Sequence, residues 1–224
     1  MASVVEVWRY PVKSMAGERL DSCLVTENGL EGDRRWALVD GAPNRAGKPL
    51  TIRQHERLMT FRARLVDHTA EIVGPAGEIH TLDDSLVAGL ARDAERPLTL
   101  RHDDGGNFDD SPVLVVNLAT VAAFGRDAGV AVDHRRFRAN LYVGGLESEE
   151  EVGWLGRRIR AGDAELEAVS RCERCVVITR DPDTATASPE LLRVLAQTRE
   201  TRMGVYCRVV RPGRVAVGDV IQAG

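Results

Sequence analysis

Two of the four cysteines, Cys172 and Cys175, are separated by two residues and stand among arginines in the segment Arg171-Cys172-Glu173-Arg174-Cys175. A thiol acts as a nucleophile or metal ligand only as the thiolate, and neighbouring guanidinium groups favour that form because they offset its charge. This segment is therefore the first place to expect chemistry.

A Cys-x-x-Cys pair can belong to a zinc site or to a redox dithiol. Zinc needs two further ligands, and only Cys23, Cys207 and five scattered histidines remain, so we do not expect a zinc site. A dithiol belongs at a helix N-terminus, whereas this pair leads into residues 176–179, a predicted strand. Two cysteines three residues apart on an extended chain lie about 10 Å from each other, beyond disulfide reach.

A third use is a single working thiolate, for which Cys175 is the better candidate because Arg174 precedes it and a polar turn follows at residues 181–183. The alternative is that Cys175 is a small buried hydrophobic residue, which is common for free cysteine. Residue chemistry alone favours neither interpretation.

Several polar residues elsewhere suit an anionic ligand as a set. They are Lys13 and Ser14 after Pro11, one inward-pointing member of the pair Arg34 and Arg35, and Arg138 with Asn140, which share a face if that stretch is extended. Each alone is more often a surface charge or a structural hydrogen bond. Together they are suited to a pocket for a phosphorylated ligand.

The composition excludes several classes of protein. With 224 residues, 43% hydrophobic and 29% charged, the chain is typical of a soluble globular protein. Its net charge of −4 does not indicate a nucleic-acid-binding protein. The first residues do not form a signal peptide, and no apolar run is long enough for a membrane helix. We therefore expect a cytoplasmic protein with reduced cysteines and no membrane association.

The elements that must position these residues are mostly short strands. They are predicted at residues 4–10, 20–26, 33–40, 50–53, 59–66, 70–73, 78–82, 98–102, 111–116, 137–143, 157–161, 165–169, 176–179, 204–210 and 215–221. About three helices are expected, at 84–94, at 117–124 and from Ser188 onward. This close spacing indicates a barrel or curled sheet, hence a mainly β (α+β) fold. A polar loop at 103–107 is the expected boundary between halves 1–105 and 106–224.

An ordered set of short motifs resembles the MOSC family, in the branch that includes the mitochondrial amidoxime-reducing component. The motifs are Tyr10-Pro11-Val12-Lys13-Ser14, Gly32-Asp33-Arg34-Arg35-Trp36, Phe137-Arg138-Ala139-Asn140, Arg174-Cys175-Val176-Val177, Asp181-Pro182-Asp183-Thr184, Gly204-Val205-Tyr206, Pro212-Gly213 and Val217-Gly218-Asp219. The resemblance covers nearly the whole chain. It implies an N-terminal β-barrel-like half (1–105) packed on a MOSC-type β-barrel domain (106–224), with molybdenum cofactor (molybdopterin) between them.

The resemblance also implies roles for individual residues. Cys175 matches the molybdenum-ligating, catalytic cysteine, and Lys13, Ser14, Arg34, Arg138 and Asn140 match residues that hold the pterin and its phosphate; Arg174 and Tyr206 fall at further pocket positions. Family members reduce N-hydroxylated compounds with electrons from a separate protein of the ferredoxin or flavin reductase type. Two alternatives stay open: a non-catalytic carrier of cofactor or persulfide sulfur on Cys175, and a cofactor-free structural domain.

Overall fold

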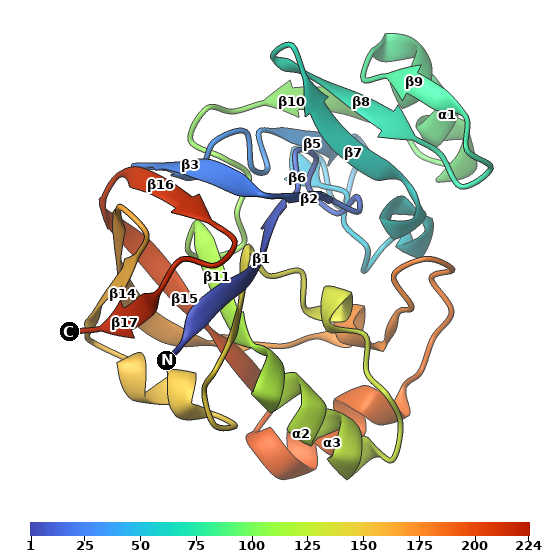
Figure 1. The fold of residues 1–224 in the computed structure, drawn as a ribbon. Coiled ribbons are helices and arrows are strands. Elements are labelled where there is room, and N and C mark those ends of the chain that lie inside the picture. Colours follow the sequence, from blue (N-terminus) through green and yellow to red (C-terminus); the bar gives the residue numbers. More distant parts are fainter.

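The computed structural model describes all residues from 1 to 224, and its central feature is a curled eight-stranded sheet (Figure 1). The strand order is β17-β13-β14-β15-β11-β12-β1-β2, and only the β11–β12 pair is parallel. The strands are β1 (Ser3–Arg9), β2 (Glu18–Leu20), β11 (Val113–Asn117), β12 (Leu141–Gly144), β13 (Arg158–Ala161), β14 (Ala164–Glu173), β15 (Arg202–Arg211) and β17 (Ile221–Ala223).

Both faces of the sheet are buried at β11, which explains the uninterrupted apolar run in this strand. Successive side chains of a strand point to opposite faces. Val113 and Val115 accordingly pack into one core, with residues of a small sheet of order β16-β3-β4, while Leu114 and Val116 pack into another. The small sheet consists of β3 (Ser22–Thr26), β4 (Gly29–Leu30) and β16 (Gly213–Ala216).

The second of these cores lies between the large sheet and two helices, α2 (Leu118–Ala128) and α3 (Glu190–Arg199) (Figure 1). Helix α2 begins where predicted, because the Asn117 side chain accepts a hydrogen bond from the Ala119 amide. It ends at Gly129, whose left-handed backbone (φ 68°) closes the last turn.

A separate core belongs to the first half of the chain. It is enclosed by a sheet of order β10-β5-β6, a sheet of order β7-β8-β9 and helix α1 (Asp84–Asp93). The strands are β5 (Trp36–Asp40), β6 (Lys48–Pro49), β7 (Arg62–Val66), β8 (Thr69–Val73), β9 (Ile79–Thr81) and β10 (Leu98–His102). In Figure 1 these elements form a lobe beside the large sheet, yet β1 crosses from this half to pair with β12.

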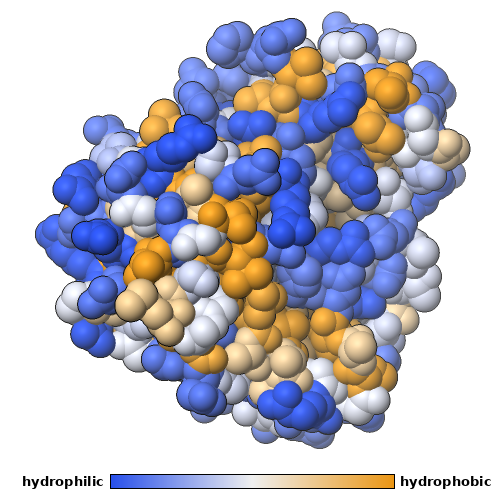
Figure 2. Space-filling model, viewed as in Figure 1, coloured by the Kyte–Doolittle hydropathy of each residue, from blue (hydrophilic) through white to orange (hydrophobic).

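The predicted mainly β class with about three short helices is confirmed. The division at residue 105 stays a prediction. On the face in Figure 2, hydrophilic residues cover most of the surface and hydrophobic ones gather in a band across its middle. No helix has the combination of length and apolar character needed to cross a membrane.

Some predicted elements were wrong. Residues 176–179 form a 3₁₀ helix instead of a strand, because Thr179 donates its hydroxyl to the Val176 carbonyl (2.7 Å) and Ile178 is buried against helix α3. Residues 50–53 form no strand, since a turn occupies residues 52–54. Residues 56–60 form a 3₁₀ helix, and the strand predicted from residue 33 begins only at Trp36.

An acidic cluster at residues 147–151 has the composition of a solvated loop, but Glu151 is not solvated. Its carboxylate is fully buried and accepts hydrogen bonds from Asn117 and Thr120 at 2.9–3.0 Å. Burial raises the pKa of Glu151 above its ordinary value, and the two hydrogen bonds only partly offset this. A buried polar group of this kind ties helix α2 to the loop that follows β12.

Candidate functional site

A pocket of about 830 Å³, including its open mouth, is lined by residues from both sides of position 105. All eight residues selected from the sequence lie on its wall: Lys13, Ser14, Arg34, Arg138, Asn140, Arg174, Cys175 and Tyr206. The structure thus brings together positions from the whole length of the chain. Their predicted roles toward a cofactor stay predictions.

Lys13 reaches the pocket from the loop that Pro11 opens after β1. Its backbone is fixed by a bridge between Val12 and Trp36, and its side chain is 92% buried. The ammonium donates to the Asn107 carbonyl and to the Asp109 carboxylate, both at 2.6 Å. Burial lowers the pKa of Lys13, although the charge of Asp109 opposes this effect.

Asp33 organises the cations on the floor of the pocket. Its fully buried carboxylate accepts from the Tyr10 amide (2.6 Å), from Asn140 Nδ2 (3.0 Å) and from Arg34. Arg34 has a left-handed backbone (φ 52°), so it lies in a turn, not on a strand beside Arg35 as predicted. Its guanidinium also donates to the Arg138 carbonyl at 3.2 Å.

Arg138 and Asn140 do not run side by side on an extended chain as predicted, because Arg138 is left-handed (φ 52°). Its guanidinium donates to the Met15 carbonyl at 2.8 Å and lies 4.6 Å from the centre of the Tyr10 ring. Burial lowers the pKa of Arg138 to about 10. The Asn140 amide is engaged by protein groups, including the Leu114 amide at 3.1 Å.

The two cysteines are unequal, and each has its own arginine. Cys175 is partly exposed at the start of the 3₁₀ helix, and its Sγ accepts from Arg53 Nε at 3.4 Å. Cys172 is buried, and its Sγ accepts from Arg174 Nη1 at 2.8 Å. Arg174 therefore pairs with Cys172, not with Cys175 as the sequence interpretation had it. The hydrogen bond with Cys175 raises the pKa of Arg53.

Tyr206 and Arg174 complete the wall beneath the cysteines. Arg174 donates to the Phe137 carbonyl at 2.6 Å, while its buried Nε has no partner. Burial, together with the nearby Cys172, raises the pKa of the Tyr206 phenol, so it is a neutral hydrogen-bonding group at physiological pH. An unsatisfied buried N–H beside a cavity is a feature that a polar ligand can satisfy.

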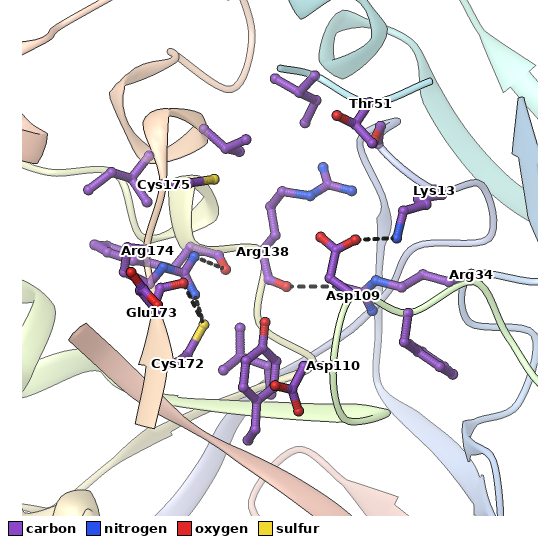
Figure 3. Close-up of a pocket in the computed structure, with 18 of the residues that line it drawn as sticks. Lys13, Arg34, Thr51, Asp109, Asp110, Arg138, Cys172, Glu173, Arg174 and Cys175 are labelled. Carbon is purple, nitrogen blue, oxygen red and sulfur yellow. Dashed lines mark hydrogen bonds and ion pairs between the residues drawn. The ribbon is translucent and has the colours of Figure 1, made fainter. Parts of the chain in front are cut away.

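Among the charged pocket residues that sequence reasoning missed, Arg53 and Asp109 contact residues that it had selected. Arg53 lies in the turn that was predicted as a strand, and Asp109 lies just beyond the loop at 103–107. Figure 3 shows Asp109 extending between Arg138 and Lys13. No local motif marks either residue, because their partners are 122 and 96 positions away.

The charge of the pocket favours an anion. Five cations line it, Lys13, Arg34, Arg53, Arg138 and Arg174, against the three carboxylates Asp109, Asp110 and Glu173. No group of three or more His, Cys, Asp or Glu side chains is placed to hold a metal ion. A metal at Cys175 would thus need most of its ligands from a bound organic group.

Comparison with known proteins covers both halves of the chain. A family model described as MOSC domain matches residues 94–222, and one described as MOSC N-terminal beta barrel domain matches residues 1–128. Molybdenum cofactor sulfurase of Caenorhabditis elegans is 25% identical over 255 residues, covering 99% of this chain but 35% of that protein. The chain therefore spans about a third of the sulfurase.

Human mitochondrial amidoxime-reducing component 1 is also 25% identical, over 284 residues that cover 99% of this chain and 82% of that protein. Among solved structures, the YUAD protein from Bacillus subtilis superposes with a TM-score of 0.55 at 16% identity, covering 99% of this chain and 94% of that one. This last similarity concerns the fold alone.

Proposed function

The chain belongs to the MOSC family, and on this premise we propose that it is a molybdenum-cofactor oxidoreductase that removes oxygen from N-hydroxylated compounds. The similarity to an amidoxime-reducing protein over nearly the full chain supports this reaction class. The observation that carries the proposal is the placement of a partly exposed Cys175 on the wall of a pocket in which cations outnumber carboxylates.

The residues present fit the cofactor. A pterin phosphate would be held by Lys13, Arg34 and Arg138, whose guanidinium and ammonium groups suit a multiply charged anion. The unpartnered Nε of Arg174 is a buried donor available to a polar ring. Cys175 would supply a thiolate, a ligand type that suits such a metal. When bound, the cofactor supplies a redox-active metal that accepts an oxygen atom from the substrate.

The chain's own groups supply binding and orientation. Arg53 donates to Cys175 Sγ at 3.4 Å and so holds the sulfur in position on the pocket wall. Asp33 fixes Arg34 and Asn140 in place, so the cations on the pocket floor are preorganised before a ligand arrives. The open mouth admits a substrate, and the electrons come from a separate donor protein of the ferredoxin or flavin reductase type.

A second candidate is a non-catalytic carrier that holds cofactor or persulfide sulfur on Cys175. Two observations favour it: the similarity to molybdenum cofactor sulfurase, and the accessibility of the Cys175 thiol beside Arg53. A carrier needs the same thiolate and the same anion pocket, but it does not turn over a substrate.

The test begins with natively purified protein from a host that makes molybdopterin. We expect molybdenum near one atom per chain by elemental analysis, the fluorescence of oxidised pterin, and benzamidoxime reduction with an artificial electron donor. Bound cofactor without turnover would identify a carrier, and absence of both molybdenum and pterin would refute the proposal.

Two matched variants test the role of Cys175. We expect Cys175→Ala to abolish reduction, whereas Cys23→Ala removes a thiol from the core away from the pocket and should keep activity. Full activity in Cys175→Ala would overturn the assignment of this residue as the metal ligand.

A further inference from the structure

Two carboxylates neutralise cations of the pocket, and the protein holds them very differently. Asp33 has no exposed surface and accepts hydrogen bonds from a backbone amide and from the side chains of Arg34 and Asn140. The side chain of Asp109 is 60% exposed, and its one hydrogen-bonding partner is Lys13. Asp33 is therefore a permanent counter-charge, whereas Asp109 can leave at little cost.

Lys13 keeps its position without Asp109. Its second partner is the carbonyl of Asn107, a residue that is 95% buried. The Asn107 amide donates to the Arg34 carbonyl (2.8 Å), its side chain donates to the same carbonyl (3.0 Å), and its Oδ1 accepts from Arg101 (2.9 Å). The ammonium thus stays directed into the pocket when the carboxylate moves away.

Asp109 occupies the place that an anion would take. Its Oδ1 lies 2.6 Å from Lys13 Nζ, its Oδ2 lies 4.0 Å from Arg53 Nη2, and Figure 3 shows it lying between Lys13 and Arg138. Burial disfavours the carboxylate, but the charges of Lys13, Arg53 and Arg34 outweigh this and lower the pKa of Asp109. The internal anion is therefore present at neutral pH.

We propose that Asp109 is a displaceable internal counter-ion, which occupies the anion subsite at Lys13 until the phosphate group of a ligand takes its place. This rests on the proposed function, since that function gives the pocket a phosphorylated ligand. A phosphate monoester carries up to two negative charges and three acceptor oxygens, against one charge and two oxygens for the carboxylate. Because the Lys13–Asp109 ion pair must break before an anion binds at Lys13, Asp109 lowers the affinity of the pocket for anions.

The chain itself offers a matched control. Asp110 lines the same pocket from the next position and accepts from the Ser111 hydroxyl (2.8 Å), but it forms no ion pair. Asp109→Asn and Asp110→Asn therefore remove the same charge from the same loop, and only the first frees Lys13. A difference in phosphate affinity between the two variants therefore measures the effect of the Lys13–Asp109 ion pair and not that of the net charge.

The experiment titrates inorganic phosphate into the full chain, produced in a strain that cannot make molybdopterin, by calorimetry at pH 8 and constant ionic strength. We expect Asp109→Asn to bind phosphate roughly 5-fold more tightly than the wild type, the value of one exposed ion pair. Asp110→Asn should stay within about 2-fold of the wild type, because an exposed charge without a partner contributes little.

A second measurement follows the proteolysis of the loop that carries Phe108 and Asp109. If phosphate displaces Asp109, phosphate should speed chymotryptic cleavage after Phe108 in the wild type. In Asp109→Asn, cleavage should be fast already without phosphate. A merely structural role for the carboxylate would not make loop cleavage depend on phosphate.

The outcomes separate the inference from the proposed function. Equal tightening in both variants, or no tightening in Asp109→Asn, would overturn the inference while leaving a phosphate-binding pocket intact. Phosphate binding to none of the three proteins would overturn both the inference and the phosphate site of the proposed function.

Discussion

Asp33 is the buried carboxylate on which the cationic floor of the pocket depends, so Asp33→Asn should destabilise the whole protein. Its two oxygens face only donors: the Tyr10 amide on one side, and Arg34 and Asn140 on the other. Asparagine replaces one oxygen with an NH₂ group. In either orientation of the amide, an N–H group then faces at least one donor, and Arg34 loses its counter-charge.

The magnitude follows from burial. Removing one partner of a buried ion pair costs about 3–5 kcal/mol, because the remaining charge is left uncompensated. The Arg34 side chain keeps 15% of its surface exposed and retains the Arg138 carbonyl as a partner, so the lower end applies. We expect a loss of about 3 kcal/mol in the free energy of unfolding, or about 6–12 °C in the melting temperature of a chain of this size.

The assay is urea unfolding followed by circular dichroism, with Asp109→Asn as the control. That variant removes the other carboxylate paired with a pocket cation. This carboxylate is 60% exposed, so water can take its place at Lys13, and Lys13 keeps the Asn107 carbonyl; the cost should be about 1 kcal/mol, well below that of Asp33→Asn. An Asp33→Asn variant that loses no more stability than Asp109→Asn would refute the view that Asp33 organises the pocket.

Three further outcomes are expected. Because Cys175 is the one cysteine that is not buried, Ellman's reagent should react rapidly with a single thiol in the native protein and with four after unfolding; several fast thiols would contradict the burial pattern. Arg53→Met should slow that rapid reaction roughly threefold, measured by stopped-flow absorbance, because the hydrogen bond to Sγ is lost. Burial raises the pKa of Glu151, so the folded state binds its proton more readily and stability falls as pH rises above the ordinary value of 4.5. Glu151→Gln should lose this part of the pH dependence in urea titrations, and an unchanged slope would argue against burial as its cause.

Much of the pocket could be predicted from the sequence, because its charged residues lie at positions that are recognisable locally. Lys13, Arg34, Arg138 and Arg174 carry charges beside turn signals or strand ends, where a ligand can reach them, and their motifs occur in a recognisable order. The same reading assigned Arg174 to the wrong thiol. Side chains two apart on an extended chain share a face, so alternation alone would have paired Arg174 with Cys172.

The missed features depend on tertiary contacts. Nothing near Arg53 in the sequence indicates that it meets Cys175, and nothing near Glu151 indicates that it is enclosed by helix α2. The 3₁₀ helix at residues 176–179 has strong β propensity, but packing against α3 determines its conformation. Local patterns report propensity, whereas these contacts arise only when distant segments meet.

The pairing of β1 with β12 has a consequence for synthesis on the ribosome. Val7 of β1 is opposite Leu141 of β12, so a growing chain must extend more than 130 residues before this ladder can close. Until then β1 has an unpaired edge, a known starting point for aggregation. Such long-range pairing slows folding. β1 therefore cannot be completed ahead of the second half, and nascent chains should expose this edge until β12 emerges.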